Sequence, residues 1–166
     1  TYFVRLTTSG SKPGGTSDER LTLTSSCVSA RPSVAWTGAE FGIAWYEVCT
    51  DPGDVWFTRA TAAGTEVAGA ERGNVVFAEA QTFPRLVWNG TGYAMVWLDD
   101  RAGGNDQLYF ARLNTDGVII GSAVQLTTPA ETTGVDGYAA LAWNSTRREY
   151  YVVWSDQRNA SETCGG

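Results

Sequence analysis

The chain has 166 residues, with 12 Lys and Arg against 18 Asp and Glu and a formal net charge of −6. This acidic balance argues against a nucleic-acid partner, because such surfaces neutralise phosphates with Lys and Arg. Histidine is absent, which excludes Ser-His-Asp and Cys-His nucleophile chemistry and nearly every common zinc site. No apolar run reaches the ~20 residues of a membrane-spanning helix, and no signal-peptide pattern follows Thr1. Because the chain begins with Thr1 rather than Met, we expect a processed or excised segment of a longer protein.

One kind of segment, with an aromatic pair, an arginine and a closing glycine, recurs along the chain. The three copies are Thr1–Gly10 (TYFVRLTTSG), Val55–Gly64 (VWFTRATAAG) and Leu108–Gly117 (LYFARLNTDG). The middle of the chain, Pro84–Gly117, shows three alternating apolar runs separated by NGTG, DDRAGGND and NTDG. Asn-Gly and Asp-Gly between such runs are strong hairpin signals. We predict an antiparallel meander that repeats every 50–60 residues or so.

Each repeat supplies three further kinds of strand. The first is short and apolar, at Pro32–Trp36, Pro84–Trp88 and Ala139–Trp143. The second ends in Trp followed two residues later by an acid, at Trp45 and Glu47, Trp97 and Asp99, and Trp154 and Asp156. The fourth is more polar, at Arg20–Thr24, Gly73–Ala78 and Ala123–Thr127, as suits an outer strand with one edge in water.

The predicted fold is an all-β propeller of four-stranded antiparallel blades, with three blade-equivalents in the chain. Residues 1–31 supply strands three and four of a split blade, 32–78 a blade, 79–137 a blade and its connection, and 138–166 strands one and two of the split blade. Three blades are fewer than the usual four to eight. We therefore expect head-to-tail oligomerisation, with six blades from two chains favoured over nine from three.

Blades of the form P-x-[LV]-x-W, W-x-[DE]-x-R and [YW]-F-x-R, closing on D-G, resemble the WD40-like repeats of TolB-type bacterial propellers. The resemblance covers nearly the whole chain, and its motifs are structural. It implies a propeller fold, export from a bacterial cell, and binding of partners or ligands. The first repeat departs from the pattern, because Val48 and Cys49 stand where the second repeat has Asp100 and Arg101.

The repeated charges and tryptophans have a structural interpretation. We predict ion pairs between neighbouring strands or blades from the arginines Arg5, Arg59 and Arg112 and the acids Glu47, Asp99 and Asp156. A ring of carboxylates presented to a ligand is the alternative. The six paired tryptophans are expected to pack between blades, whereas Trp56, beside Phe57 on the third strand, is a candidate for outward exposure.

The loop that begins at Asp99 and ends at Asp106 gathers oxygen donors. A solvated turn explains this composition. Calcium is the alternative, although the EF-hand spacing is missing and Arg101 lies inside the cluster. We predict no other metal or cofactor.

The three cysteines form no metal motif and leave two readings open. Cys27, Cys49 and Cys164 could be small buried or loop thiols. Alternatively, Cys27 and Cys49, which lie in two loops at the same end of the blades, form a disulfide in an oxidising compartment.

The function predicted from these features is a non-catalytic binding or assembly module, exported, with its own second copy as partner and a carbohydrate or protein ligand at the loop face. The candidate ligand-binding residues are Trp56, Asp100, Arg101, Asp106 and Asp136. The alternative is a propeller glycosidase, which needs two carboxylates and no histidine. Its candidate acids are Asp54, Asp100, Asp106, Asp136 and Glu162.

Overall fold

The protein is all-β, as predicted, in the residues that the computed structural model describes: 1–13, 18–21, 27–49, 53–68, 73–74, 81–101, 106–128 and 135–156. The strands are β1 (Tyr2–Phe3), β2 (Glu19–Arg20), β3 (Val28–Trp36), β4 (Glu40–Val48), β5 (Asp54–Thr61), β6 (Gly73–Asn74), β7 (Gln81–Trp88), β8 (Tyr93–Asp99), β9 (Gln107–Leu113), β10 (Ile119–Gln125), β11 (Val135–Asn144) and β12 (Glu149–Asp156). These residues include no helix long and apolar enough to cross a membrane.

Within the described ranges the strands form four antiparallel sheets. The first sheet is β1–β2, the second β3–β4–β5–β6, the third β7–β8–β9–β10 and the fourth β11–β12. In the second and third sheets every strand pairs with the next along the chain, which is the predicted four-stranded meander. The first sheet holds the segments predicted as third and fourth strands, and the fourth sheet holds those predicted as first and second.

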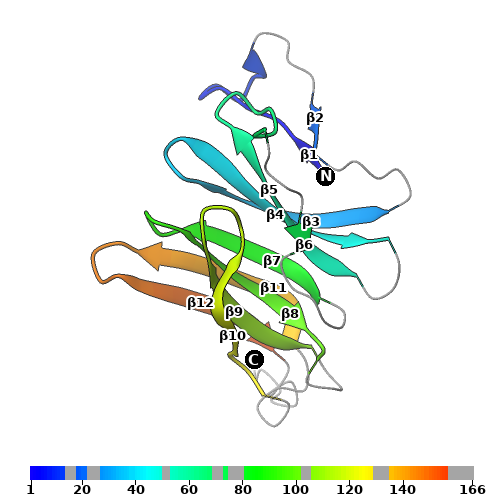
Figure 1. Ribbon diagram of the computed structural model, residues 1–166, viewed down its shortest axis with the longest axis vertical. Helices are drawn as coiled ribbons and strands as arrows, with labels where there is room; N and C mark the ends of the chain where they lie inside the picture. Colours follow the sequence, from blue (N-terminus) through cyan, green and yellow to red (C-terminus); the bar gives the residue numbers. More distant parts are fainter. Residues whose placement is uncertain are drawn as a thin grey trace, which may run out of the picture.

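The sheets stack face to face in chain order, from the first sheet (blue) to the fourth (orange and red) in Figure 1. Strand β7 packs against β3 of the second sheet on one side and against β11 of the fourth on the other. Two hydrogen bonds join these three strands directly. The Leu86 N–H donates to Ser33 Oγ at 2.9 Å, and Arg85 Nε donates to the Ala139 carbonyl at 3.1 Å. The second, third and fourth sheets therefore meet along their first strands.

Alternation along each strand produces an apolar layer between each pair of neighbouring sheets. Leu21 and Phe3 of the first sheet pack on Ile43 and Trp45 of the second. Between the second and third sheets the layer includes Ala44, Val55, Phe57, Tyr93, Met95 and Trp97. Between the third and fourth it includes Val96, Leu98, Leu141 and Val152. The third sheet is thus buried on both faces, and every described side chain of β8 is buried.

A bulge recurs at the same place in each first strand. The pairing register shifts between Ala30 and Ser33 in β3, between Thr82 and Arg85 in β7, and between Val135 and Ala139 in β11. Within the first two bulges Arg31 and Phe83 have positive φ angles of 58° and 55°. The Arg31 guanidinium carbon lies 3.4 Å from the centroid of the Phe83 ring, so the two bulges also contact each other.

A hairpin glycine of one sheet lies against a phenylalanine of the sheet before it. A Cβ added to Gly117 would lie 2.1 Å from Cδ1 of Phe57, which is 2% exposed. The corresponding Gly64 lies against Phe3, where an added Cβ would be 3.0 Å from the ring. Both glycines also have positive φ, at 85° and 91°. The closing glycine is therefore needed for turn geometry and for close packing of the sheets.

Tyr93 lies fully buried where the second and third sheets meet. Its ring covers Gly42, at which an added Cβ would be 2.4 Å from the ring, and its hydroxyl has no hydrogen-bond partner in the described part of the chain. Burial raises the pKa of Tyr93 to about 12, and the negative charge of Glu40 adds to this shift. A buried hydroxyl without a partner is a cost to the folded state.

The free energy of unfolding is expected to fall by up to about 2 kcal/mol as the pH rises from 10 to 12, because of Tyr93. Above pH 10 the unfolded chain releases the phenolic proton, whereas the folded protein keeps it until about pH 12. The unfolded state therefore binds fewer protons and gains stability. Urea unfolding of the wild type and of Tyr93→Phe at pH 8 and pH 11 measures this term as a difference, since the other tyrosines are common to both. An equal loss in both proteins would contradict it.

Candidate functional site

The repeated Trp-x-acid motif closes a hydrogen bond at the end of each second strand whose side chains are described. Residues i and i+2 of a strand lie on the same face, so the carboxylate reaches the indole N–H. Trp45 Nε1 donates to Glu47 Oε2 at 3.1 Å, and Trp97 Nε1 donates to Asp99 Oδ2 at 3.0 Å. Both indoles are buried, and each would otherwise leave a donor without a partner. The motif has a structural role.

At the end of β8, Asp99 is the centre of a charged cluster. Its carboxylate is completely buried and accepts a bidentate hydrogen-bonded ion pair from Arg101, with Nε 2.8 Å from Oδ1 and Nη2 on Oδ2. The Arg101 backbone N–H also donates to Oδ1 at 2.9 Å. These hydrogen bonds raise the pKa of Arg101. The guanidinium carbon lies 4.7 Å from the centroid of the Tyr109 ring, so the cation covers the aromatic face.

Asp100 and Asp106 flank this ion pair. Burial raises the pKa of Asp106, and the negative charges of Asp100 and Asp99 raise it further. Among the described residues, one buried oxygen of Asp100, Oδ1, has no hydrogen-bond partner. Residues 102–105, between the two acids, lie outside the described residues, so the calcium alternative for this loop stays a prediction. The arrangement concentrates negative charge beside one partly exposed guanidinium.

Arg101→Met is expected to lower the free energy of unfolding by about 2 kcal/mol, because it leaves the buried Asp99 charge with only an indole and a backbone N–H. The partial exposure of Arg101 keeps the loss below that of a fully buried pair. Arg112→Met is the matched control: Arg112 is exposed, and a loss below about 0.5 kcal/mol is expected. Denaturant unfolding of both variants is the measurement. Equal losses of stability in the two variants would show that the Asp99–Arg101 ion pair does not stabilise the fold more than an exposed arginine does.

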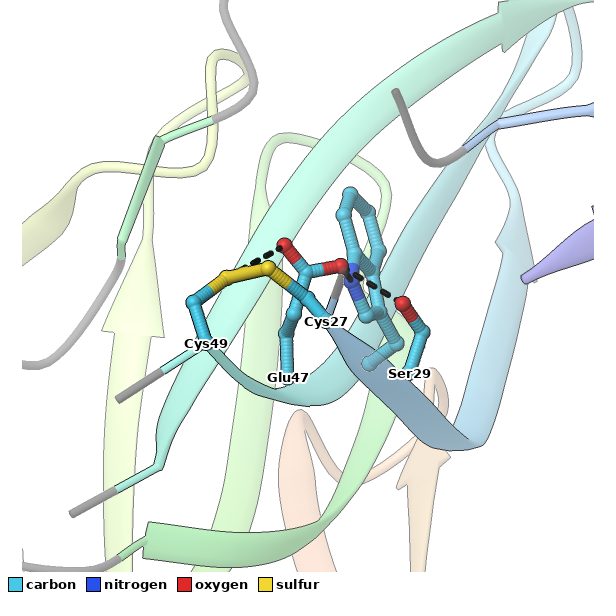
Figure 2. Close-up of a disulfide and its surroundings, with 5 residues drawn as sticks. Cys27, Ser29, Glu47 and Cys49 are labelled. Carbon is cyan, nitrogen blue, oxygen red and sulfur yellow. Dashed lines mark hydrogen bonds between the residues drawn. A yellow bond between two sulfur atoms is a disulfide. The ribbon is translucent and has the colours of Figure 1, made fainter. Parts of the chain in front are cut away.

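In the second sheet a disulfide occupies the place of the arginine. Cys27 and Cys49 are bonded, with Cα atoms 4.3 Å apart, so the second of the two alternatives for these residues is the one found. Figure 2 shows Glu47 between this disulfide and Ser29, whose hydroxyl donates to Glu47 Oε2 at 2.6 Å. Cys49 Sγ lies 3.6 Å from Glu47 Oε1, a packing contact because a disulfide sulfur has no hydrogen to donate. Cys164 lies outside the described residues.

The partner predicted for Arg59 is wrong. Arg59 pairs with Glu40 at 2.9 Å and with Asp116 of the third sheet at 3.3 Å, rather than with Glu47. The antiparallel register is the reason, since it places Arg59 opposite Gly42 and Glu47 opposite Asp54, toward the other end of the strands. The Arg59–Asp116 pair does join two sheets, which was one of the two predicted settings.

Of the other residues predicted to form ion pairs, one forms a pair with a different partner and two have no pair in the described residues. Asp99 forms an ion pair as predicted, but with Arg101, two residues along, rather than with Arg112. Arg112 lies opposite Ala94 and Arg5 follows β1, and no ion pair is found for either among the described residues. The side chain of Asp156 lies outside the described part of the chain.

The predicted ligand-binding residues lie at the same end of the sheets but do not form one cluster. Asp100, Arg101 and Asp106 are neighbours at the β8–β9 connection. Trp56 is half-buried and packs on the layer between the first and second sheets, so its expected outward exposure is wrong. Asp136 follows Val135, which pairs with Asp156 at this end, and its side chain is not described.

Sequence reasoning missed two components of this end of the molecule. Tyr109, stacked under Arg101, was assigned only to the repeated aromatic pair, and Ser29 was not singled out. The Arg101 contact follows from the register, which pairs Trp97 with Tyr109. Compared with known proteins, the chain matches no family model, no curated protein and no solved structure, so the resemblance to TolB-type repeats remains an expectation.

Proposed function

We propose that the chain is a segment of a β-propeller that serves as a non-catalytic assembly and binding module. The supporting observation is the stacking order of the sheets: β3, β7 and β11, the first strands of consecutive sheets, lie next to one another, and the remaining strands follow outward (Figure 1). Four-stranded antiparallel sheets arranged about common inner strands are the building blocks of propellers.

The recognition surface in this proposal is the end of the sheets where β8 turns into β9. Loops carried on a regular scaffold are the usual place for recognition. The cluster of Asp100, Arg101 and Asp106 there combines a guanidinium, anchored by Asp99, with two carboxylates. Anchored charges of both signs suit a polar ligand, such as a carbohydrate or a peptide. The Cys27–Cys49 disulfide supports an exported location, because disulfides persist in oxidising compartments.

Two measurements test the module. An experimental structure of the assembled particle is expected to show the sheets radiating from an axis lined by the first strands, and a flat or extended stack would reject the propeller. Glycan and peptide arrays, followed by calorimetry, are expected to give a ligand whose binding falls at least tenfold in Asp100→Ala/Asp106→Ala. Binding in the control Arg112→Ala is expected to be unchanged. A ligand that binds both variants with the same affinity would show that the binding site does not include Asp100 and Asp106.

Glycoside hydrolysis is the second candidate, favoured by Asp106. A raised pKa beside a second carboxylate is the property of a general acid in glycosidases, and burial raises the pKa of Asp106 next to Asp100. Sustained turnover of an aryl glycoside that is lost in Asp106→Asn would establish this activity and reject the non-catalytic module.

A further inference from the structure

Several large apolar side chains that are exposed in the described residues lie at positions that are buried elsewhere in the repeat, and the others lie beside them on the same strands. They are Tyr2, Val4, Leu6, Val28, Val34, Trp36, Val118, Ile120, Val124, Leu126, Tyr151, Val153 and Trp154. Most belong to the first sheet, the first strand of the second, the last strand of the third, and the fourth. Because the sheets repeat, the residues that cover a buried counterpart in one sheet indicate which residues would cover the exposed side chain in another.

On the first strand of the second sheet, Val34 and Trp36 are 55% and 45% exposed. The residue that corresponds to Val34 in the third sheet is Leu86, which is 7% exposed because Ala35 and Ala44 of the preceding sheet pack in the same layer. Among the described residues, no pair of first and second strands packs on this open face of the second sheet (Val34 and Trp36). Exposed apolar surface of this kind marks an interaction site.

The fourth sheet offers a surface of the required type. Ala142 and Val153 occupy the positions of Ala35 and Ala44, and both are exposed, Val153 by 66%. This open face of the fourth sheet (Ala142, Tyr151 and Val153) is the equivalent of the face with which the second sheet covers the third. The two are not identical, since Tyr151 stands where the second sheet has a glycine.

The outer strands repeat this relation. Tyr2, Val4 and Leu6 are 67%, 40% and 60% exposed, whereas their counterparts Tyr109, Ala111 and Leu113 are at most 6% exposed. Phe57 of the second sheet packs in the layer that covers these counterparts. The residue that corresponds to Phe57 in the third sheet is Phe110, and next to it on β10 lie the exposed side chains of Ile120 and Val124.

The hairpin glycines lead to the same arrangement. Gly64 and Gly117 each lie against a phenylalanine of the preceding sheet, whereas Gly10, the third member of the set, has nothing within 4 Å of an added Cβ. Phe110 is the phenylalanine that the repeat would place against Gly10. One docking event would thus satisfy the exposed face of the first sheet and that of the third together.

The strand edges are complementary as well. In the second and third sheets the second strand pairs with the third, with Trp45 opposite Trp56 and Trp97 opposite Tyr109. In the described residues β12 pairs only with β11, and β1 only with β2. The same register would place Trp154 of β12 opposite Tyr2 of β1. Figure 1 shows β1 and β12 at opposite ends of the stack, so the two edges of one chain do not meet.

We propose that a second copy of this chain completes the sheets: β12 of each copy pairs with β1 of the other, in the register Trp154–Tyr2 and Tyr151–Arg5. This inference rests on the proposed propeller. The described residues of each chain form two four-stranded sheets and two two-stranded sheets, and the two-stranded sheets together would make one more. Two copies thus give six four-stranded units, within the four to eight that propellers have, and the pair has the usual twofold symmetry.

Cysteine cross-linking tests the register. In a Cys164→Ser background, protein carrying Arg5→Cys is mixed with protein carrying Tyr151→Cys under mild oxidation. The two proteins are unfolded and refolded together, and the proposal expects a covalent two-chain species only in this mixture. Its yield is expected to approach half of the protein, because random pairing places half of the chains in mixed dimers. Ala142→Cys replaces Tyr151→Cys in the matched control, because Ala142 lies opposite Tyr151 on β11 and one strand farther from Arg5, about 10 Å away. A disulfide cannot span that distance, so no covalent species is expected.

Light scattering at micromolar concentration measures the particle mass and so tests whether the open faces of the second and fourth sheets mediate association. The wild type is expected at twice the chain mass of 17.8 kDa. Val153→Arg and Val34→Arg are each expected to weaken association at least a hundredfold. Ser145→Arg adds the same charge at the β11–β12 turn and is expected to leave the mass unchanged.

Several results would overturn the second copy as partner: a monomeric wild type, a particle of three or more chains, or a cross-link within one chain when both cysteines are on it. A monomer whose near-ultraviolet circular dichroism is that of a packed protein would leave the proposed module standing, with another polypeptide as its partner. Sheets that do not radiate from an axis in an experimental structure would remove both proposals.

Discussion

Gly117→Ala is expected to lower the free energy of unfolding by about 3–4 kcal/mol. The new Cβ would lie 2.1 Å from Cδ1 of Phe57, and that ring is held in the layer between the second and third sheets. Either the ring leaves its position or the β9–β10 hairpin moves away from the second sheet. The positive φ of 85° adds about 1 kcal/mol for any residue with a Cβ. Urea unfolding followed by tryptophan fluorescence measures the loss.

Gly90→Ala separates the two contributions. Gly90 has a φ of 100° in the turn between β7 and β8, and nothing lies within 4 Å of an added Cβ. Only the backbone term of about 1 kcal/mol is therefore expected. If the two variants lost the same stability, the contact of the hairpin with Phe57 would not contribute to sheet stacking.

Removing the disulfide with Cys27→Ala/Cys49→Ala is expected to cost about 3 kcal/mol. The cysteines are 22 residues apart and flank β3 and β4, so the bond closes the loop that contains this hairpin in the unfolded chain as well as in the folded one. The chain-entropy account attributes the stabilisation to the restricted unfolded state. Denaturant unfolding with and without a reductant is the measurement.

The reductant supplies the control for this prediction. Wild type in reductant is expected to match the double variant, and the double variant is expected to be insensitive to reductant. A double variant as stable as the oxidised wild type would show that the β3–β4 pairing alone fixes this end of the second sheet. The packing of the disulfide on Glu47 would then carry no measurable energy.

The strands were predictable because two local signals agree along the chain. Alternating apolar residues select one face for burial, and Asn-Gly, Asp-Gly and single glycines fix the turns. The same signals gave the order of strands in the second and third sheets. Their assembly into a propeller is a step that repeat length suggests but local patterns do not determine, since it depends on how the faces of different sheets fit.

The ion pairs were mispredicted because repetition in sequence does not specify register. Arg59 and Glu47 recur with constant spacing, yet they lie toward opposite ends of the paired strands β5 and β4. The acid instead follows its tryptophan by two residues and serves the indole N–H, a contact that the Trp-x-acid spacing itself could have indicated. Arg101 reaches Asp99 over the same short separation.

The sequence contains a signal for the bulges, namely a proline inside two of the first strands. Pro32 and Pro84 lie inside apolar strands, and proline within a sheet is restricted to edges and bulges. Each follows the residue with positive φ, Arg31 or Phe83. The contact between Arg31 and the Phe83 ring, by contrast, depends on the spacing of two sheets, and no local pattern reports it.

Each described sheet packs only on the sheets next to it, and this arrangement affects the cooperativity of unfolding. In such a quasi-one-dimensional array, stability is close to a sum of terms for each unit and each junction. The third sheet, covered on both faces, is the natural nucleus from which structure would propagate in both directions. In a chain kept monomeric by Val34→Arg, local opening would begin at the first and fourth sheets, whose outer faces have no neighbour in the described chain. Amide exchange would then slow from these ends toward β8.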